Sequence, residues 1–154
     1  MRLAEFHELN EAPDYNYTKF NNRDEDIKTI EWEIVSTNAG LTITAWDPNL
    51  PKYYYSFAGR IRALAEHDYV HIISIKIKPK WHGTGLGQLL YDKAITQAKI
   101  DGHKYFRSDY GNYISAMAQK AWERLSQRYP VKKVMSKGKL RYYQIDLSKI
   151  HATK

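Results

Sequence analysis

Residues 75–90 read IKIKPKWHGTGLGQLL, and this stretch decides the fold of the chain. Apolar residues alternate up to Pro79, glycines follow at positions 83, 85 and 87, and an amphipathic pattern begins at Leu86. This order predicts a strand, a glycine-containing loop and a helix. The N-terminus of a helix attracts anions, because its backbone N–H groups and its dipole both favour negative charge. The stretch therefore predicts a site for a phosphate or pyrophosphate group.

The flanking sequence predicts one α+β domain over residues 1–154. The first 28 residues are polar and weakly periodic, so we expect an irregular N-terminal segment there. Ser115 is a suitable N-cap for the second helix. The pattern predicts strands over 30–35, 39–46, 53–64, 69–77 and 104–107, helices over 86–98 and 115–129, and a C-terminal hairpin over 131–146.

Composition excludes several kinds of chemistry. The chain has no cysteine, which rules out disulfides, thiolate metal sites and a cysteine acyl-enzyme. We expect no metal site. The first residues contain no apolar signal-type run, and no apolar run is long enough to span a membrane. We therefore expect a cytoplasmic protein, either a monomer or a homodimer.

The net charge of +7 is concentrated toward the C-terminus, where residues 131–154 carry seven basic side chains and one acidic side chain. Such a segment suits nucleic acid, a phosphorylated cofactor or an acidic protein surface. Lysines also protect the exposed edges of sheets, so a solvated hairpin without a partner explains the same pattern. The sequence leaves both interpretations open.

Two common nucleotide-binding loops fit the glycines poorly. A mononucleotide P-loop requires Lys-Ser or Lys-Thr after its last glycine, whereas Gln88 and Leu89 follow Gly87 here. A dinucleotide fingerprint belongs to a repeated βαβ unit, whereas antiparallel-looking strands precede this loop. The phosphate-bearing ligand therefore belongs to another class.

The stretch resembles motif A of the GCN5-related N-acetyltransferase (GNAT) superfamily, whose members use acyl-coenzyme A. That motif is a strand reading hydrophobic-x-Val-x-Pro, an aromatic residue, and Gln/Arg-x-x-Gly-x-Gly/Ala at the start of a long helix. Ile75-x-Ile77-x-Pro79-x-Trp81 and the segment His82 to Gly87 match it without a gap. The resemblance covers about residues 39–146, extends to short bacteriophage-type members, and implies a mostly antiparallel central sheet flanked by helices.

The resemblance also implies a coenzyme A site. Backbone groups of Ile75 and Ile77 would pair with the pantetheine arm, which Ser115 would also contact. His82 stands where the family has Gln or Arg and would donate a hydrogen bond to a phosphate. The remaining pyrophosphate-binding residues would be Gly83, Thr84, Gly85, Leu86, Gly87 and Gln88.

Catalytic roles follow from the same resemblance. The family's base lies four residues before the first pantetheine-contacting position, which is His71 here, and histidine titrates near neutral pH. On an unbroken strand, His71 would share a face with Ile75 and Ile77. Trp122 occupies the position of the family's general-acid tyrosine, so Tyr110, Tyr113 or water would protonate the departing thiolate. Asp109 would hold the amine.

The leading hypothesis is an acetyl-CoA-dependent N-acetyltransferase that acts on a primary amine by direct attack. The amine would belong to a protein lysine or N-terminus, or to a small molecule. One alternative is a GNAT-fold protein with impaired catalysis that binds a protein or nucleic-acid partner, and another is a phage-type enzyme that modifies DNA bases. In both, the basic hairpin would meet the partner.

Overall fold

The computed structural model describes residues 27–52 and 56–150, and strands outnumber helices in this part of the chain. The described strands are β1 (Glu31–Thr37), β2 (Gly40–Trp46), β3 (Phe57–Ala65), β4 (Tyr69–Ile77), β5 (Tyr105–Arg107), β6 (Val131–Ser136) and β7 (Lys139–Asp146). The helices named in this part of the chain are α3 (Leu86–Ile100) and α4 (Ala116–Leu125), with 3-10 turns η2 (Pro79–Trp81), η3 (Gly111–Tyr113) and η4 (Leu147–Lys149).

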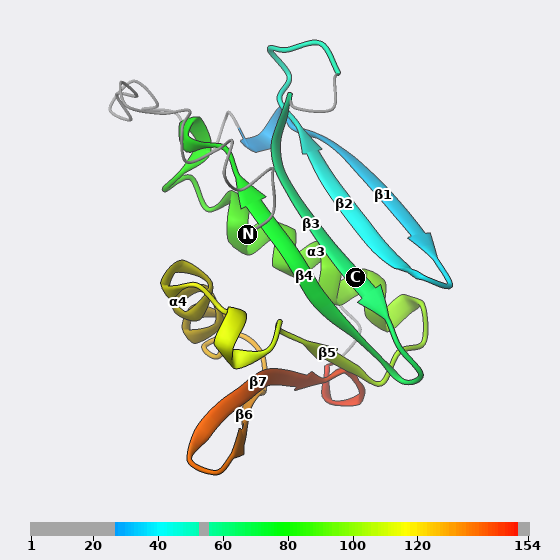
Figure 1. The fold of residues 1–154 in the computed structure, drawn as a ribbon. Coiled ribbons are helices and arrows are strands. Elements are labelled where there is room, and N and C mark those ends of the chain that lie inside the picture. The colour runs from blue at the N-terminus through cyan, green and yellow to red at the C-terminus, as the bar shows by residue number, and fades with distance from the viewer. Residues whose placement is uncertain (1–26, 53–55, 151–154) are drawn as a thin grey trace.

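All seven described strands form one sheet in the order β1-β2-β3-β4-β5-β7-β6. Each neighbouring pair is antiparallel except β4 and β5, which run parallel. These two strands pair only where residues 69–71 face residues 105–107, and they then diverge (Figure 1). Beyond His71, β4 has β3 on one side and no described strand on the other. We call this second side the open edge of β4.

Both helices pack against the apolar face of the sheet. Gly59 in β3 lets α3 approach closely, because a Cβ there would lie 2.9 Å from Leu90 Cδ1 and 3.1 Å from Leu86 Cδ2. Trp122 of α4 is fully buried and stacks on Tyr143 of β7, with ring centroids 5.5 Å apart. Aromatic contacts of this kind add to the free energy gained from burial alone. This helix-covered side contains the core.

The strands contain three register shifts. In one of them, between β2 and β3, Ala58 is the extra residue; the other two change the direction of side chains near the site. Arg62 pairs with Ser74 but Ala63 pairs with Ile72, so Ile73 is an extra residue in β4. In the same way, Val134 pairs with Tyr142 and Met135 with Leu140, which makes Arg141 an extra residue in β7. A bulge re-aims the side chains around it and breaks the simple alternation of faces.

The structure confirms the expected mixed fold, with a mostly antiparallel sheet flanked by helices. Ser115 caps α4 as expected, since its Oγ accepts a hydrogen bond from the N–H of Ala118 at 3.1 Å. The expected end of this helix at residue 129 is wrong. Helix α4 ends at Leu125, and a tighter turn follows before Pro130, which disfavours helical geometry in the residue preceding it.

Part of the expected structure lies outside the described residues. This applies to positions 1–26 of the expected irregular segment and to positions 53–55 of the expected strand 53–64. Within residues 27–52 and 56–150, no helix is long and apolar enough to cross a membrane.

Candidate functional site

The glycine loop leads directly into the N-terminus of α3. Gly85 caps the helix at a φ of 89°, a conformation that favours glycine, and a Cβ there would meet nothing within 4 Å. Thr84 Oγ1 accepts the N–H of Leu86 at 3.3 Å. The N–H groups of Gly87 and Gln88 lie in the first turn, where a helix offers no intrahelical acceptor, and this turn contains no acidic residue. The geometry suits an anion.

The buried carboxylate of Asp47 fixes the segment that precedes this loop. Asp47, at the end of β2, accepts hydrogen bonds through Oδ2 from Lys80 Nζ at 3.2 Å and from Trp81 Nε1 at 3.3 Å. Its Oδ1 accepts the N–H of Asn49 at 2.9 Å. These contacts fix η2 immediately before the glycines. Sequence spacing gives no sign of this role, because Lys80 and Trp81 lie more than 30 residues from Asp47 along the chain.

The open edge of β4 presents backbone groups in line with the loop. Lys78 N–H donates to Ala58 O at 2.9 Å, toward β3. Because backbone groups alternate in direction along a strand, those of Ile77 and Ile75 point toward the open edge. His82 Nε2 donates to Ile77 O at 2.8 Å. This bond places the ring of His82 between the strand and the glycine loop.

The bulge at Ile73 separates His71 from the residues that follow it. Ile75 pairs with buried Ile61, whereas His71 pairs with Leu64, which is 44% exposed. The expectation that His71 shares a face with Ile75 and Ile77 is therefore wrong. The physical reason is the extra residue, which inverts the alternation and turns His71 to the face away from α3.

His71 lies among aromatic and charged side chains. Its ring centroid is 5.9 Å from that of Tyr69 and 6.2 Å from that of Tyr110. Burial lowers the pKa of His71 below its usual value of 6.5, while the carboxylates of Asp109 and Glu66 act in the opposite direction. A lowered pKa keeps the imidazole neutral at pH 7, and a neutral imidazole can accept a proton.

Of the other residues expected to act in catalysis or substrate binding, the structure brings only some close to His71. Asp109 and Tyr110 follow β5 and lie next to His71. Tyr113, at the end of η3, is 70% exposed, and no contact with His71 is recorded for it within the described residues. Ser115 begins α4. Trp122, at the position of the family's acid, is enclosed by Tyr91, Phe106 and Tyr143.

An arginine that the sequence analysis overlooked lies beside His71. Arg107 pairs with His71 across the parallel strands, and its guanidinium carbon is 3.8 Å from the ring centroid of Tyr69 and 4.5 Å from that of Tyr142. Its Nε donates to Gln144 Oε1 at 2.7 Å. Alternation along β5 indicates which face of the sheet Arg107 occupies. Its neighbours on β7 cannot be predicted in this way, because they depend on the order of the strands in the sheet. Within the described ranges, no group of three or more His, Asp or Glu side chains is arranged to hold a metal.

No protein-family model and no curated protein sequence matches the chain. Solved structures do match. The ribosomal-protein-S18-alanine N-acetyltransferase from Escherichia coli aligns over 98% of this chain and 93% of its own, with a TM-score of 0.53 and 11% identity. A GNAT-family acetyltransferase from Desulfovibrio desulfuricans aligns over 71% and 70%, with a TM-score of 0.52 and 14% identity.

A Bacillus subtilis acetyltransferase, solved in complex with CoA, aligns over 76% of this chain and 98% of its own, with a TM-score of 0.50 and 16% identity. At such identities the likeness concerns the fold. The protein therefore has the fold of the GCN5-related N-acetyltransferases.

Proposed function

We propose that the protein is an N-acetyltransferase that moves an acetyl group from acetyl-CoA to a primary amine. The observation that carries this proposal is the continuity of the open edge of β4 with the N-terminus of α3. Backbone groups of Ile75 and Ile77 point along that edge, and the loop that follows favours an anion. A ligand with an extended amide-containing arm and a pyrophosphate matches both parts.

The residues present fit coenzyme A. Backbone groups of Ile75 and the N–H of Ile77 would pair with the amides of the pantetheine arm, while Ile77 O keeps its hydrogen bond from His82. Within residues 83–88, the N–H groups of Gly87 and Gln88 would bind the pyrophosphate, because those of Thr84 and Leu86 already donate to Trp81 O and Thr84 Oγ1. Ser115, at the start of α4, would contact the arm, and His82 would lie at the junction of arm and pyrophosphate. Bound acetyl-CoA supplies a thioester that is reactive toward amines.

The reaction is a direct transfer. The amine nitrogen attacks the thioester carbonyl carbon, the C–N bond forms, and the C–S bond breaks. His71 accepts the proton that the amine loses, and Asp109 favours the imidazolium that results. The thiolate leaves and takes a proton from Tyr110, from Tyr113 or from water. Trp122 has no acidic group for this step, and its burial gives it a structural role.

Cofactor binding is tested by thermal unfolding with and without CoA. CoA at 100 times its Kd should stabilise the protein by about 2.7 kcal/mol, which corresponds to about 5–10 °C in Tm for a chain of this size. Gly87→Asp has room, since a Cβ at Gly87 would lie 3.9 Å from Ile77, and its carboxylate would compete with the phosphates. Thr96→Asp is the matched control on an exposed turn of α3.

We expect Gly87→Asp to keep the Tm of the free protein and lose the shift with CoA, while Thr96→Asp keeps both. The absence of a shift in the wild-type protein at saturating CoA would refute the proposal. Turnover is then tested by CoA release with a panel of amines. His71→Ala should abolish release while preserving the CoA shift; unchanged release would exclude His71 as the base. A CoA shift without turnover of any amine would favour the alternative of a partner-binding protein.

A further inference from the structure

The face of the sheet away from α3 carries a row of polar side chains. His71, Arg107, Gln144 and Lys132 are neighbours across β4, β5, β7 and β6 in that order. Tyr142 lies in the same β7 strand and stacks on Arg107. We call this surface the polar face. It contains the candidate base His71, so an acceptor amine must reach this surface.

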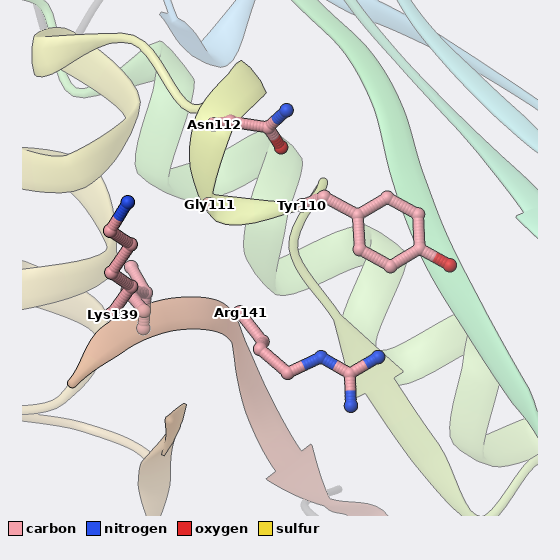
Figure 2. A pocket seen from close by; sticks show the side chains of 6 residues that line it. Tyr110, Gly111, Asn112, Lys139 and Arg141 are labelled. Carbon is pink, nitrogen blue, oxygen red and sulfur yellow. The ribbon is translucent and has the colours of Figure 1, made fainter. Parts of the chain in front are cut away.

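The bulge in β7 directs a second arginine toward the polar face. Arg141 is the extra residue of that strand, and its guanidinium carbon lies 5.8 Å from the ring centroid of Tyr142. Without the bulge, alternation would turn position 141 toward the core side, where Tyr143 and Ile145 are buried. Figure 2 shows the side chain of Arg141 extending in the same direction as the ring of Tyr110.

A pocket of about 560 Å³ lies between η3 and the start of β7 (Figure 2). This volume lies within the range of small-molecule sites. Its wall depends on Gly111, because a Cβ there would lie 2.0 Å from the carbonyl oxygen of Leu140. The pocket is lined by Tyr110, Gly111, Asn112, Lys139, Leu140 and Arg141.

The charges of this pocket are all positive. Lys139 and Arg141 line it, and no acidic residue does. Neither cation forms an ion pair with a described residue. The guanidinium of Arg141 matches the oxygens of a carboxylate or a phosphate. The side chain of Lys139 extends in another direction (Figure 2) and adds positive charge to the pocket.

Tyr110 connects this pocket with His71. It lines the pocket, and its ring centroid is 6.2 Å from that of His71. Asp109 precedes it and acts on His71 electrostatically. The two ends of the site therefore differ in charge: beside the base, the carboxylates of Asp109 and Glu66 oppose the charge of Arg107, whereas only positive groups line the pocket across Tyr110.

We infer that the acceptor is a small amine that also carries an anionic group, either a carboxylate or a phosphate. Its anionic group binds in the pocket beside Arg141, and its amine lies beside His71 and Asp109. This inference rests on the proposed function and specifies its substrate class.

The test uses the full-length protein saturated with CoA or acetyl-CoA, so that the loop before α3 is occupied and does not bind the probe. Two matched pairs differ by one anionic group: lysine with cadaverine for the carboxylate, and phosphoethanolamine with ethanolamine for the phosphate. Binding is measured by calorimetry and acetylation by CoA release. We expect the anionic member of one pair to have a kcat/KM about tenfold higher than its partner. The pair that shows the preference identifies the anion.

Arg141→Ala should bring this ratio close to one, mainly by raising the KM of the anionic member. Lys133→Ala is the matched control. Lys133 belongs to the same hairpin but pairs with the core-facing Tyr143, so its removal takes one charge from the other face of the sheet and should leave the kcat/KM ratio unchanged. Equal values within both pairs, or no binding of either anionic probe to the CoA-saturated protein, would overturn the inference. It would also be overturned if peptides were acetylated without any preference for the anionic probes. A CoA shift in Tm together with CoA release on any amine would leave the proposed transferase activity standing after such a result.

Discussion

Asp47 offers a test of how the fold positions the glycine loop. Its carboxylate is buried and accepts hydrogen bonds from the Lys80 ammonium, the Trp81 indole and the Asn49 amide. Asp47→Asn keeps one oxygen for Asn49 but turns an NH₂ group toward two donors. The loss is two hydrogen bonds to a carboxylate, from the Lys80 ammonium at 3.2 Å and the Trp81 indole at 3.3 Å, and at these long distances each is worth about 1.5 kcal/mol, the lower end for charge-assisted bonds. The Lys80 side chain is 28% exposed, which weakens the first of these bonds through solvent screening.

We therefore expect Asp47→Asn to lower the free energy of unfolding by about 2–3 kcal/mol, or about 4–12 °C in Tm for a chain of this length. The measurement is urea unfolding followed by circular dichroism at pH 7, with an unchanged m-value as the sign that only stability has changed. Glu123→Gln removes the same charge from an exposed position on α4 and should stay within about 0.5 kcal/mol of wild type. Because η2 precedes the loop, affinity for CoA should also fall in Asp47→Asn. A stability loss below about 1 kcal/mol would refute the role assigned to this carboxylate.

Three further changes test other parts of the site. In an NMR titration the pKa of His71 should lie below 6.5, and Asp109→Asn should lower it further because a negative charge that favours the imidazolium is removed; an upward shift would contradict this. Tyr143→Phe should leave the protein as stable or raise the free energy of unfolding by about 1 kcal/mol, since the buried hydroxyl has no hydrogen-bond partner among the described residues; a clear loss in urea unfolding would reveal a missing partner. Gly111→Ala should cost about 1–3 kcal/mol by the same measurement, because its methyl group would press on the Leu140 carbonyl and push η3 off β7, and a neutral result would show that the turn yields freely.

The order of elements could be predicted because its signals are local. The strand over 69–77 follows from alternating β-branched residues, and the start of α3 follows from Gly85 and the apolar period after it. The tight turn at Lys137 and Gly138, both with positive φ, is likewise encoded by adjacent residues. The predicted extension of the second helix to residue 129 is wrong. Apolar spacing continues to Tyr129, but the helix already ends at Leu125, so the apolar period alone does not locate the end of the helix.

Most of the site is not encoded locally. The bulge at Ile73 is invisible in the run His71-Ile72-Ile73-Ser74-Ile75, because isoleucines suit either face and no glycine marks the irregularity. Contacts of Asp47 with Lys80, and of Gly111 with Leu140, join positions about 30 residues apart. Such contacts depend on strand order, which the sequence indicates through the resemblance and not through its own periodicity.

The acceptor side of the site follows from two shifts of register. In β4, the extra residue Ile73 leaves Ile75 and Ile77 on the core side and turns His71 to the polar face. In β7, the extra residue Arg141 directs a guanidinium to that same face while Leu140 and Tyr143 remain with the core. A shift of one residue moves every side chain beyond it to the other face, so removing either bulge would separate the base from the cationic pocket. Under the proposed function, the two bulges would therefore allow one sheet to present a cofactor edge and an acceptor surface at once, and this arrangement would persist whichever tyrosine or water protonates the thiolate.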